Sequence, residues 1–260
     1  MIGIFGGTGL YSLLDEHEKK EIETPFGKPS SPVMIGKIGD IDVAFIARHG
    51  ENHEIPPHKI PFKANIEAFK QLGVTHIISP AAVGSLKAKI KPGDFLIPDQ
   101  FINFTHREST FFNGPGTTHI SSDEPYCPDL RSLLIKKGKE MGLNIHENGT
   151  VIVVQGPRFS SKAESNFFRT VGGDVINMTQ YPELILAREK EMCYASICIV
   201  TDYDTGLKDD PNVSAVNIEE VLKIFKENNG KIKEIVSMLV KEIPEQRNCV
   251  CSKALTGASL

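Results

Sequence analysis

Gly173-Asp174-Val175-Ile176-Asn177-Met178-Thr179 runs from a glycine turn into an apolar pair and then into a polar end. Val175 and Ile176 predict a short buried strand, and Pro182 stands where a following helix can start. Ligands of α/β proteins bind where strands end and loops begin, so Met178 and Thr179 are placed to offer an apolar wall and a hydroxyl. Taken alone, this run is better explained by a buried strand with a polar end and no ligand.

Strands and helices alternate on both sides of this run. Apolar runs typical of strands lie at 2–5, 43–47, 76–79, 95–97, 151–154 and 195–200. Helical patterns lie at 62–72, 128–142, 216–228 and 231–243, and Ser161 and Glu164 have capping-box spacing before another helix. This alternation predicts an α/β sheet, and no shift in composition marks a boundary. We therefore expect one domain over residues 1–260, with a short tail from about residue 244.

Composition excludes several classes of protein. The 260 residues are 40% hydrophobic and 24% charged, with a net charge of −4, which disfavours a nucleic-acid-binding protein because such proteins are usually basic. No apolar run approaches the roughly 20 residues of a membrane helix. Residues 1–5 carry no basic segment and are typical of a first strand, so the sequence predicts a cytoplasmic protein.

Five cysteines are present, and no pair has the CxxC spacing of a zinc ribbon. An odd number of cysteines in an intracellular chain usually means buried or idle thiols. Hyperthermophiles are the exception, because their intracellular proteins can carry disulfides.

The turn Gly6-Gly7-Thr8-Gly9-Leu10 follows the first strand. It offers backbone N–H groups and one hydroxyl to an anion. Ser12 stands where a GxGxxG motif needs its third glycine, and the lysine of a P-loop is absent, so a dinucleotide site is disfavoured. A tight turn after an edge strand explains the run as well as a small-anion site does.

Arg48-His49-Gly50 ends the second strand. The guanidinium of Arg48 has a fork of donors that suits phosphate, and His49 can donate beside it. His49 and His53 are four residues apart, but Gly50 and the following prolines make a helix there improbable, so a metal site is disfavoured. Taken alone, Arg48 and His49 are as typical of a protein surface as of a site.

Thr201-Asp202-Tyr203-Asp204 closes the strand at 195–200. If the strand continues, Asp202 and Asp204 point to the same face, where one can act as an acid and the other can orient it. A solvated strand end is the alternative. Taken together, the strand ends predict an anion held by Thr8, Arg48, His49 and Thr179, with Asp202 and Asp204 facing a second, polar ligand.

These motifs resemble the 5′-methylthioadenosine phosphorylases, a branch of the trimeric purine nucleoside phosphorylases. The resemblance covers residues 2 to about 242. Its most specific parts are Gly156-Pro157-Arg158-Phe159-Ser160-Ser161 and Asp174-Val175-Ile176-Asn177-Met178-Thr179. It implies a single-domain, nucleoside-phosphorylase-like α/β fold, with a mixed, distorted central sheet surrounded by helices. It also implies a homotrimer or a dimer of trimers.

The resemblance implies phosphorolysis of 5′-methylthioadenosine to adenine and 5-methylthioribose 1-phosphate, with phosphate as co-substrate and neither metal nor organic cofactor. The phosphate-binding residues that it implies are Thr8, Arg48, His49, Ala81, Ala82 and Thr179. The nucleoside-binding residues that it implies are Phe159, Ser160, Met178, His119, Ile218 and Leu222, with His119 reaching a neighbouring subunit. Asp202 would face N7 and the 6-substituent of the purine as the catalytic residue, and Asp204 would support it.

The sequence departs from the family at three places. Ala81 stands where the family commonly has Thr or Asn, and Thr205 stands where a Trp usually follows the Asp-Tyr-Asp run. Cys249-Val250-Cys251 resembles the CxC ending of archaeal hyperthermophile members, so we expect a Cys249–Cys251 disulfide and a thermostable protein. At most one further bridge is expected among Cys127, Cys193 and Cys198.

Two other functions remain open. A 6-oxopurine phosphorylase acting on inosine, guanosine or methylthioinosine is one alternative. Asp202 disfavours it because an ionised carboxylate accepts a hydrogen bond from a 6-amino group, which a 6-oxo base lacks. Ser160 also stands where 6-oxopurine enzymes use Glu. A nucleotide-binding module without catalysis would need neither the paired aspartates nor the anion-binding residues.

Overall fold

The computed structural model describes residues 1–6, 8–14, 17–207, 213 and 215–259. The described strands are β1 (Ile2–Gly6), β2 (His17–Lys20), β3 (Val33–Ile38), β4 (Ile41–Ala47), β5 (His76–Ser85), β6 (Phe95–Leu96), β7 (Gln100–Phe104), β8 (Ile145–His146), β9 (Thr150–Val154), β10 (Val175–Asn177) and β11 (Cys193–Asp202). The described helices are α1 (Phe62–Gln71), α2 (Pro128–Glu140), α3 (Lys162–Thr170), α4 (Gln180–Glu189) and α5 (Ile218–Val240), with 3₁₀ turns η1 (Thr8–Leu13), η2 (Pro57–Lys59) and η3 (Val250–Lys253).

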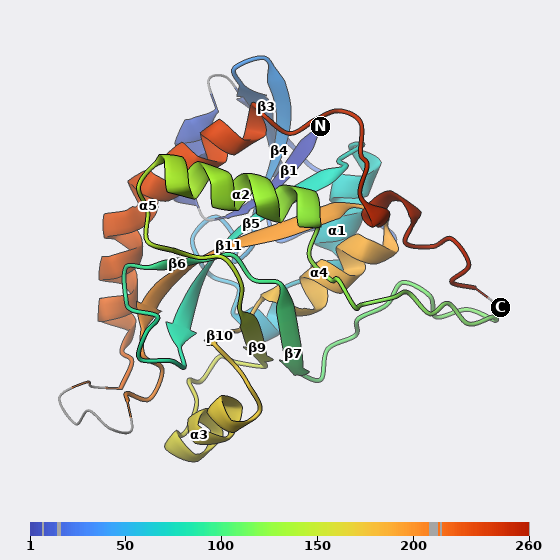
Figure 1. Ribbon diagram of the computed structural model, residues 1–260. Helices are drawn as coiled ribbons and strands as arrows, with labels where there is room; N and C mark the ends of the chain where they lie inside the picture. The colour runs from blue at the N-terminus through green and yellow to red at the C-terminus, as the bar shows by residue number, and fades with distance from the viewer. Residues whose placement is uncertain (7, 15–16, 208–212, 214, 260) are drawn as a thin grey trace.

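All the described strands belong to one mixed sheet, which divides at β5. The strand order is β2-β3-β4-β1-β5-β10-β9-β7, while β11 pairs in parallel with β5 and carries β6 and β8 on its other side. β5 is therefore bonded to β1, β10 and β11 at once. The expected mixed and distorted sheet surrounded by helices is confirmed (Figure 1).

β5 and β11 are buried along almost their whole length, and each is a nearly continuous apolar run. Such strands are typical of a sheet covered on both faces. One hydrophobic core lies between the sheet and the helices α2 and α5, and a second lies between the sheet and α1 and α4 (Figure 1). Because helices pack on both faces of the sheet, the carboxyl ends of β5 and β11 are held in fixed positions, where a functional site can form.

Local signals set several boundaries. α3 begins as its sequence indicates, because Ser161 and Glu164 form the capping box. The run at 173–179 forms β10 and the start of α4, whose helical backbone continues regularly only after Tyr181. The strands β2, β3, β7 and β8 have no clear alternation in sequence, and the sequence did not predict them.

Two expectations are wrong. β1 is not an edge strand, because it pairs with β4 on one side and β5 on the other. The two helices expected at 216–228 and 231–243 are one helix, α5. Gly230 does not interrupt it, since a helix tolerates one glycine when a long apolar face packs against the core.

Candidate active site

Asp202 lies at the carboxyl end of β11, against Gly84 of β5. A Cβ atom at Gly84 would come within 2.8 Å of Asp202 Oδ1 and 3.2 Å of Ile176 Cγ2. Gly84 also pairs with Ile176 of β10 and with Asp202 of β11, so three strands meet at this point. Only a residue without a side chain lets the Asp202 carboxylate approach the backbone this closely.

The carboxylate of Asp202 is largely buried and hydrogen-bonded to its own chain. Its Oδ2 accepts from the Thr201 hydroxyl at 2.7 Å, and its Oδ1 accepts from the Asp204 N–H at 2.7 Å. Burial raises the pKa of Asp202 from 3.8 to about 6, and these two hydrogen bonds oppose the rise. A carboxyl with this pKa can exchange a proton near neutral pH.

Asp204 does not follow the strand alternation that the sequence suggested. β11 ends at Asp202, and Asp204 has a left-handed backbone with φ of 53°. Its backbone N–H, rather than its side chain, supports Asp202. The expectation that both carboxylates point to one face of a continued strand is therefore wrong, because the strand has already ended.

Three buried polar atoms near Asp204 make no hydrogen bond to any described residue: Asp204 Oδ2, Ser160 Oγ and Ser165 Oγ. Burial raises the pKa of Asp204, and the nearby hydroxyls of Ser165 and Ser160 oppose that rise. Phe159, next to Ser160, exposes 41% of its surface. Buried polar atoms without partners are uncommon and costly, so this group of atoms marks a place for a polar ligand or water.

The guanidinium of Arg48 is buried and held by a second carboxylate, Glu183 of α4. Arg48 Nε and Nη2 donate to the two Glu183 oxygens at 2.7 and 3.0 Å. Nη1 donates to the Pro80 carbonyl at 3.2 Å, and Nη2 also donates to Ser79 Oγ at 2.5 Å. Burial is the largest single influence and lowers the pKa of Arg48, but the charge and the hydrogen bonds of Glu183, with smaller contributions from Tyr194 and Cys198, together raise it above its usual value, so the arginine remains charged.

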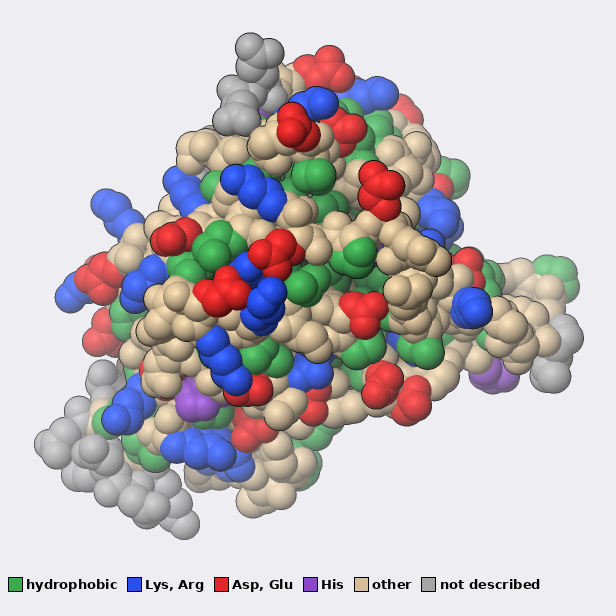
Figure 2. All heavy atoms as spheres, turned by 45° about the horizontal axis from the view of Figure 1, so that its top comes forward, with side chains coloured by type: hydrophobic (Ala, Val, Ile, Leu, Met, Phe, Trp, Pro, Cys, Tyr) green, Lys and Arg blue, Asp and Glu red, His purple; other side chains and the backbone are tan. Residues whose placement is uncertain are grey.

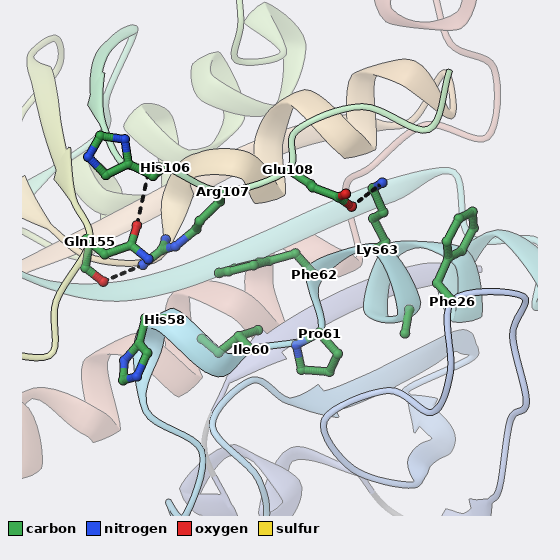
Figure 3. A pocket seen from close by; sticks show the side chains of 11 residues that line it. Phe26, His58, Ile60, Pro61, Phe62, Lys63, His106, Arg107, Glu108 and Gln155 are labelled. Carbon is green, nitrogen blue, oxygen red and sulfur yellow. Dashed lines mark hydrogen bonds and ion pairs between the residues drawn. The ribbon is translucent and has the colours of Figure 1, made fainter. Parts of the chain in front are cut away.

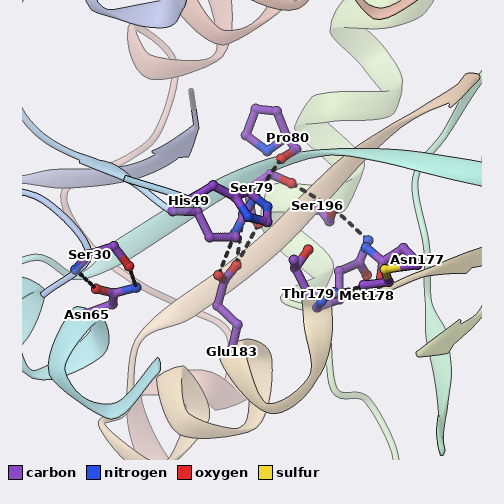
Figure 4. Close-up of polar contacts among 12 residues, drawn as sticks. Ser30, His49, Asn65, Ser79, Pro80, Asn177, Met178, Thr179, Glu183 and Ser196 are labelled. Atoms are coloured by element: carbon purple, nitrogen blue, oxygen red, sulfur yellow. Dashed lines mark hydrogen bonds and ion pairs between the residues drawn. The ribbon is translucent and has the colours of Figure 1, made fainter. Parts of the chain in front are cut away.

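Glu183 is the centre of a buried polar network (Figure 4). Its Oε1 accepts from Ser79 Oγ at 2.8 Å and from the Tyr194 hydroxyl at 2.8 Å, besides Arg48. These bonds connect β4, β5, β11 and α4. Glu183 was not among the residues predicted from the sequence. Its position directly before the apolar run Leu184-Ile185-Leu186 could have indicated a buried carboxylate.

The ring of His49 lies beside this network, half-buried. Its Nδ1 is 2.9 Å from the Ile55 carbonyl, and its ring stacks on His53 at 4.6 Å between centroids. Burial lowers the pKa of His49 from 6.5 to about 4, and the charge of Arg48 adds to that effect. The neutral ring donates through Nδ1 to the carbonyl, so Nε2 carries the free lone pair.

The other expected phosphate residues meet near Arg48. Thr179 is buried at the start of α4, four residues before Glu183, and its hydroxyl does not cap the helix (Figure 4). Ala81 and Ala82 follow Pro80 on β5. The Arg48 N–H donates to the Gly6 carbonyl at 3.1 Å, which brings the glycine turn to the same place. The side chain of Thr8 lies outside the described part of the chain.

Met178 packs against the glycine of the Gly-Pro-Arg-Phe run. A Cβ atom at Gly156 would come within 2.5 Å of the Met178 sulfur. Gly156 has φ of 64°, which an L side chain rarely adopts, so the close contact and the backbone both require glycine. The two stretches that carry the family resemblance are thus adjacent in space.

The expected residues for the 5′ end lie at two separate places, and only the start of α5 is close to Asp204, whose carbonyl accepts from the Val216 N–H at 2.7 Å. Ile218 and Leu222 lie exposed on the first turns of α5. His119 lies in the loop between β7 and α2, which extends with the C-terminal tail away from the sheet, on the opposite side of the molecule from the start of α5 (Figure 1). His119 donates its backbone N–H to the Ala258 carbonyl at 2.7 Å.

A separate cavity of about 390 Å³ lies beside this site (Figure 3). Arg107 in its wall donates to the carbonyls of Met178 and Gln155, each at 2.7 Å, and its guanidinium carbon is 5.2 Å from the centre of the Phe62 ring. Burial lowers the pKa of Arg107 to about 10. None of the expected site residues lines this cavity, so Arg107 supports the backbone around Met178 from outside the site.

Comparison with known proteins identifies a matching family model, similar sequences and a similar structure. The model of the phosphorylase superfamily matches residues 1–241. S-methyl-5′-thioadenosine phosphorylase of Pyrococcus abyssi is 50% identical over 255 residues, which cover 98% of this chain and 97% of the relative. A 6-oxopurine nucleoside phosphorylase of Pyrococcus furiosus is 42% identical, with 99% and 98% covered. A crystal structure of methylthioadenosine phosphorylase from an antarctic soil metagenomic library superposes with a TM-score of 0.92 at 38% identity, covering 100% of this chain and 92% of that one.

Proposed function

This chain belongs to the phosphorylase superfamily, and from that premise we propose that it catalyses phosphorolysis of 5′-methylthioadenosine to adenine and 5-methylthioribose 1-phosphate. The relative from Pyrococcus abyssi carries the corresponding name at 50% identity. The observation that carries the proposal is the largely buried carboxyl of Asp202, whose pKa is near 6 and whose Oδ1 accepts from the backbone N–H of Asp204, a residue with an unpartnered buried carboxylate oxygen. The reaction is a pentosyl transfer from a purine to phosphate.

The phosphate half of the site contains the end of β4, the middle of β5 and the start of α4. The four hydrogen bonds of Arg48 to Glu183, Ser79 and Pro80 use four of its five side-chain N–H groups. One Nη1 N–H remains, and Thr179 adds a hydroxyl. Backbone N–H groups of the glycine turn and of Ala82 are further donors. We assign phosphate to this group because charge-assisted hydrogen bonds in a dry site bind an anion strongly.

The purine half contains Asp202, Asp204, Phe159 and Ser160. As the C1′–N9 bond breaks, its electron pair moves into the purine, and a proton from Asp202 at N7 neutralises the charge. A phosphate oxygen forms the new bond to C1′, and the phosphate charge stabilises the positive charge that develops on the sugar. Met178, which packs against Gly156 and directly precedes Thr179 in the sequence, is assigned to the ribose.

The proposed steps use protein groups and phosphate, and no step calls for a metal or an organic cofactor. The homotrimer or dimer of trimers, the cytoplasmic location and thermostability stay predictions, as does a single domain over residues 1–260.

A 6-oxopurine phosphorylase is the second candidate, favoured by the 42% identical relative from Pyrococcus furiosus. The two functions differ at the 6-position, where an amino group donates and an oxo group accepts. When one oxygen of Asp202 carries the proton for N7, the other oxygen still accepts from the amino group, whereas an Asn can donate to the oxo group.

The deciding experiment measures phosphate-dependent release of adenine and hypoxanthine from matched 5′-methylthio-nucleosides. We expect the wild type to prefer the 6-amino substrate and Asp202→Asn to shift the ratio of the two kcat/KM values by at least about tenfold toward the 6-oxo substrate, as expected for a hydrogen bond worth 1.4 kcal/mol or more. Asp174→Asn is the control, because Asp174 accepts from the Thr150 N–H at 2.9 Å, away from the site. An unchanged ratio in Asp202→Asn would remove Asp202 from purine recognition.

A further inference from the structure

Four of the five cysteines converge in the interior although they lie far apart in the sequence. The Sγ atoms of Cys127, Cys193, Cys249 and Cys251 all lie within 4.8 Å of one another. Cys127 precedes α2, Cys193 begins β11, and Cys249 and Cys251 lie at the start of η3. All four are buried free thiols. The disulfide expected between Cys249 and Cys251 is therefore not present in the structure.

The cluster is remote from the proposed active site. Cys193 and Asp202 stand at opposite ends of β11, which at the usual rise of a strand places them roughly 30 Å apart. The fifth cysteine, Cys198, lies between them along the strand and belongs to a different environment. Its Sγ is 3.0 Å from Gln180 Nε2 and 3.6 Å from Ser196 Oγ.

The arrangement of the four sulfur atoms suits a tetrahedral metal ion. In a zinc site with four thiolates each Zn–S bond is about 2.3 Å, so neighbouring sulfurs lie about 3.8 Å apart. In the structure Cys193 Sγ and Cys249 Sγ are 3.3 Å apart, and no sulfur is more than 4.8 Å from any other. Small movements of the side chains would make all four equidistant from one central ion.

We propose that Cys127, Cys193, Cys249 and Cys251 form a structural site for a thiophilic divalent cation such as Zn²⁺. On binding, four S–H bonds are lost, four metal–sulfur bonds form and four protons pass to solvent, with no change in oxidation state. Disulfide formation instead needs an oxidant, and it joins the sulfurs in pairs that must approach to about 2.05 Å. Two such pairs would leave no thiolate for a metal.

A metal at this place ties the C-terminal tail to the core. η3 is held between the start of β11 and the start of α2 by the two tail cysteines. The residues after η3 then run to the loop that carries His119. There the Ala258 carbonyl accepts from the His119 N–H at 2.7 Å, and Thr118 Oγ1 is 2.9 Å from Ser259 Oγ. The metal would thus stabilise the position of the loop as well as the tail.

The test uses full-length protein prepared with a reductant, without oxygen and in a phosphate-free buffer. We expect about one zinc per chain by elemental analysis, and after exchange about one Co²⁺ per chain, with the visible absorption of tetrahedral thiolate coordination. Cys127→Ser and Cys249→Ser should lose most of the bound cobalt. Cys198→Ser should retain it, because Cys198 is equally buried but lies outside the cluster.

A second measurement separates metal binding from misfolding of a variant. A chelator should lower the melting temperature of the wild type and of Cys198→Ser but leave that of Cys249→Ser unchanged. The proposal would be overturned if reduced wild-type protein bound no cobalt, or if Cys198→Ser and the cluster variants bound it equally. Peptide mapping of the oxygen-free, reduced protein that showed two disulfides among the four cysteines would also overturn it.

Discussion

Arg48 shows how a buried environment alters the role suggested by a motif. The sequence presents an arginine whose fork of donors suits phosphate, but in the structure most of that fork is bonded to Glu183, Ser79 and Pro80. Its side chain is 95% buried and that of Glu183 is 99% buried. The pair therefore fixes the geometry around the proposed phosphate position, and one N–H of Arg48 is left over for the proposed anion.

Replacement of Arg48 by Ala should reduce stability severely. Glu183 would be left charged and buried without its partner, which typically costs about 3–5 kcal/mol of unfolding free energy. Urea unfolding of Arg48→Ala measures the loss. The double variant Arg48→Ala/Glu183→Gln should recover part of it, because Gln carries no charge. If Arg48→Ala lowered the unfolding free energy by less than about 1 kcal/mol, the pair of Arg48 and Glu183 would not be a major source of stability in this region.

His49 should take up a proton when phosphate binds. Folding lowers its pKa from 6.5 to about 4, so at pH 8 the ring is neutral and Nε2 accepts rather than donates. A phosphate dianion next to Nε2 raises that pKa, so a proton comes to lie between ring and anion. Calorimetric titration with phosphate in buffers of different ionisation enthalpy measures the uptake, which we expect to be up to about one proton.

The control for this prediction is His49→Gln, which keeps a polar side chain but cannot titrate. Proton uptake should fall toward zero in this variant, and phosphate binding should weaken. The same uptake in both proteins would mean that another group takes the proton and that His49 does not titrate with the anion.

Two helical glycines, Gly230 in the middle of α5 and Gly138 in the last turn of α2, differ in what surrounds them. Gly230 of α5 has open space where a Cβ atom would lie, whereas at Gly138 of α2 a Cβ atom would fall 1.7 Å from Ile145 Cδ1 and 3.0 Å from Ile145 Cγ1. The same substitution is therefore expected to have opposite effects in the two helices.

Gly230→Ala should stabilise the protein by about 0.5–1 kcal/mol, because alanine loses less backbone entropy in a helix. Gly138→Ala should destabilise it by roughly 1–3 kcal/mol, because the half-buried side chain of Ile145, which packs against the core, must move. Urea unfolding of both variants tests the pair. A destabilised Gly230→Ala would contradict the description of α5 as one regular helix through residue 230.

Viewed as a whole, the molecule separates His119 from the rest of the proposed site. The loop that carries His119 and the C-terminal tail project together from the body, opposite the start of α5 (Figure 1). If His119 serves a neighbouring subunit, as the family resemblance implies, each complete site takes residues from two chains.

Combining two variants that are each impaired toward 5′-methylthioadenosine tests this arrangement. His119→Ala and Asp202→Asn each damage every site in a homo-oligomer, whichever chain supplies the residue. Hetero-oligomers formed by coexpression should regain turnover of 5′-methylthioadenosine if sites are shared, because some combine an intact Asp202 with a neighbour's intact His119. If each chain holds a whole site, mixed oligomers will show only the average of the two variants.

Charged side chains of both signs are mixed on the part of the surface that is shown in Figure 2. Neither α5 nor any other described helix combines the length and the apolar character needed to cross a bilayer.

The sequence by itself determined the α/β class, most of the long strands and helices, and the motifs that meet at the site. Periodic apolar runs and capping residues are local signals, so they predict α3 and β11 without knowledge of the rest of the chain. A glycine turn, a strand-terminal Arg-His pair and the aspartates of the Asp-Tyr-Asp run likewise indicated an anion and a second, polar ligand from residue chemistry alone, and the family resemblance implied that these are phosphate and a purine.

Only the tertiary structure decided the interior position of β1, the buried pair of Arg48 with Glu183, and the group of four cysteines. Arg48 and Glu183 are 135 residues apart, and Cys127 and Cys251 are separated by most of the C-terminal half of the chain. Such contacts depend on which strands become neighbours in the sheet, and that choice follows from burial of the whole core. No local pattern in the sequence records it.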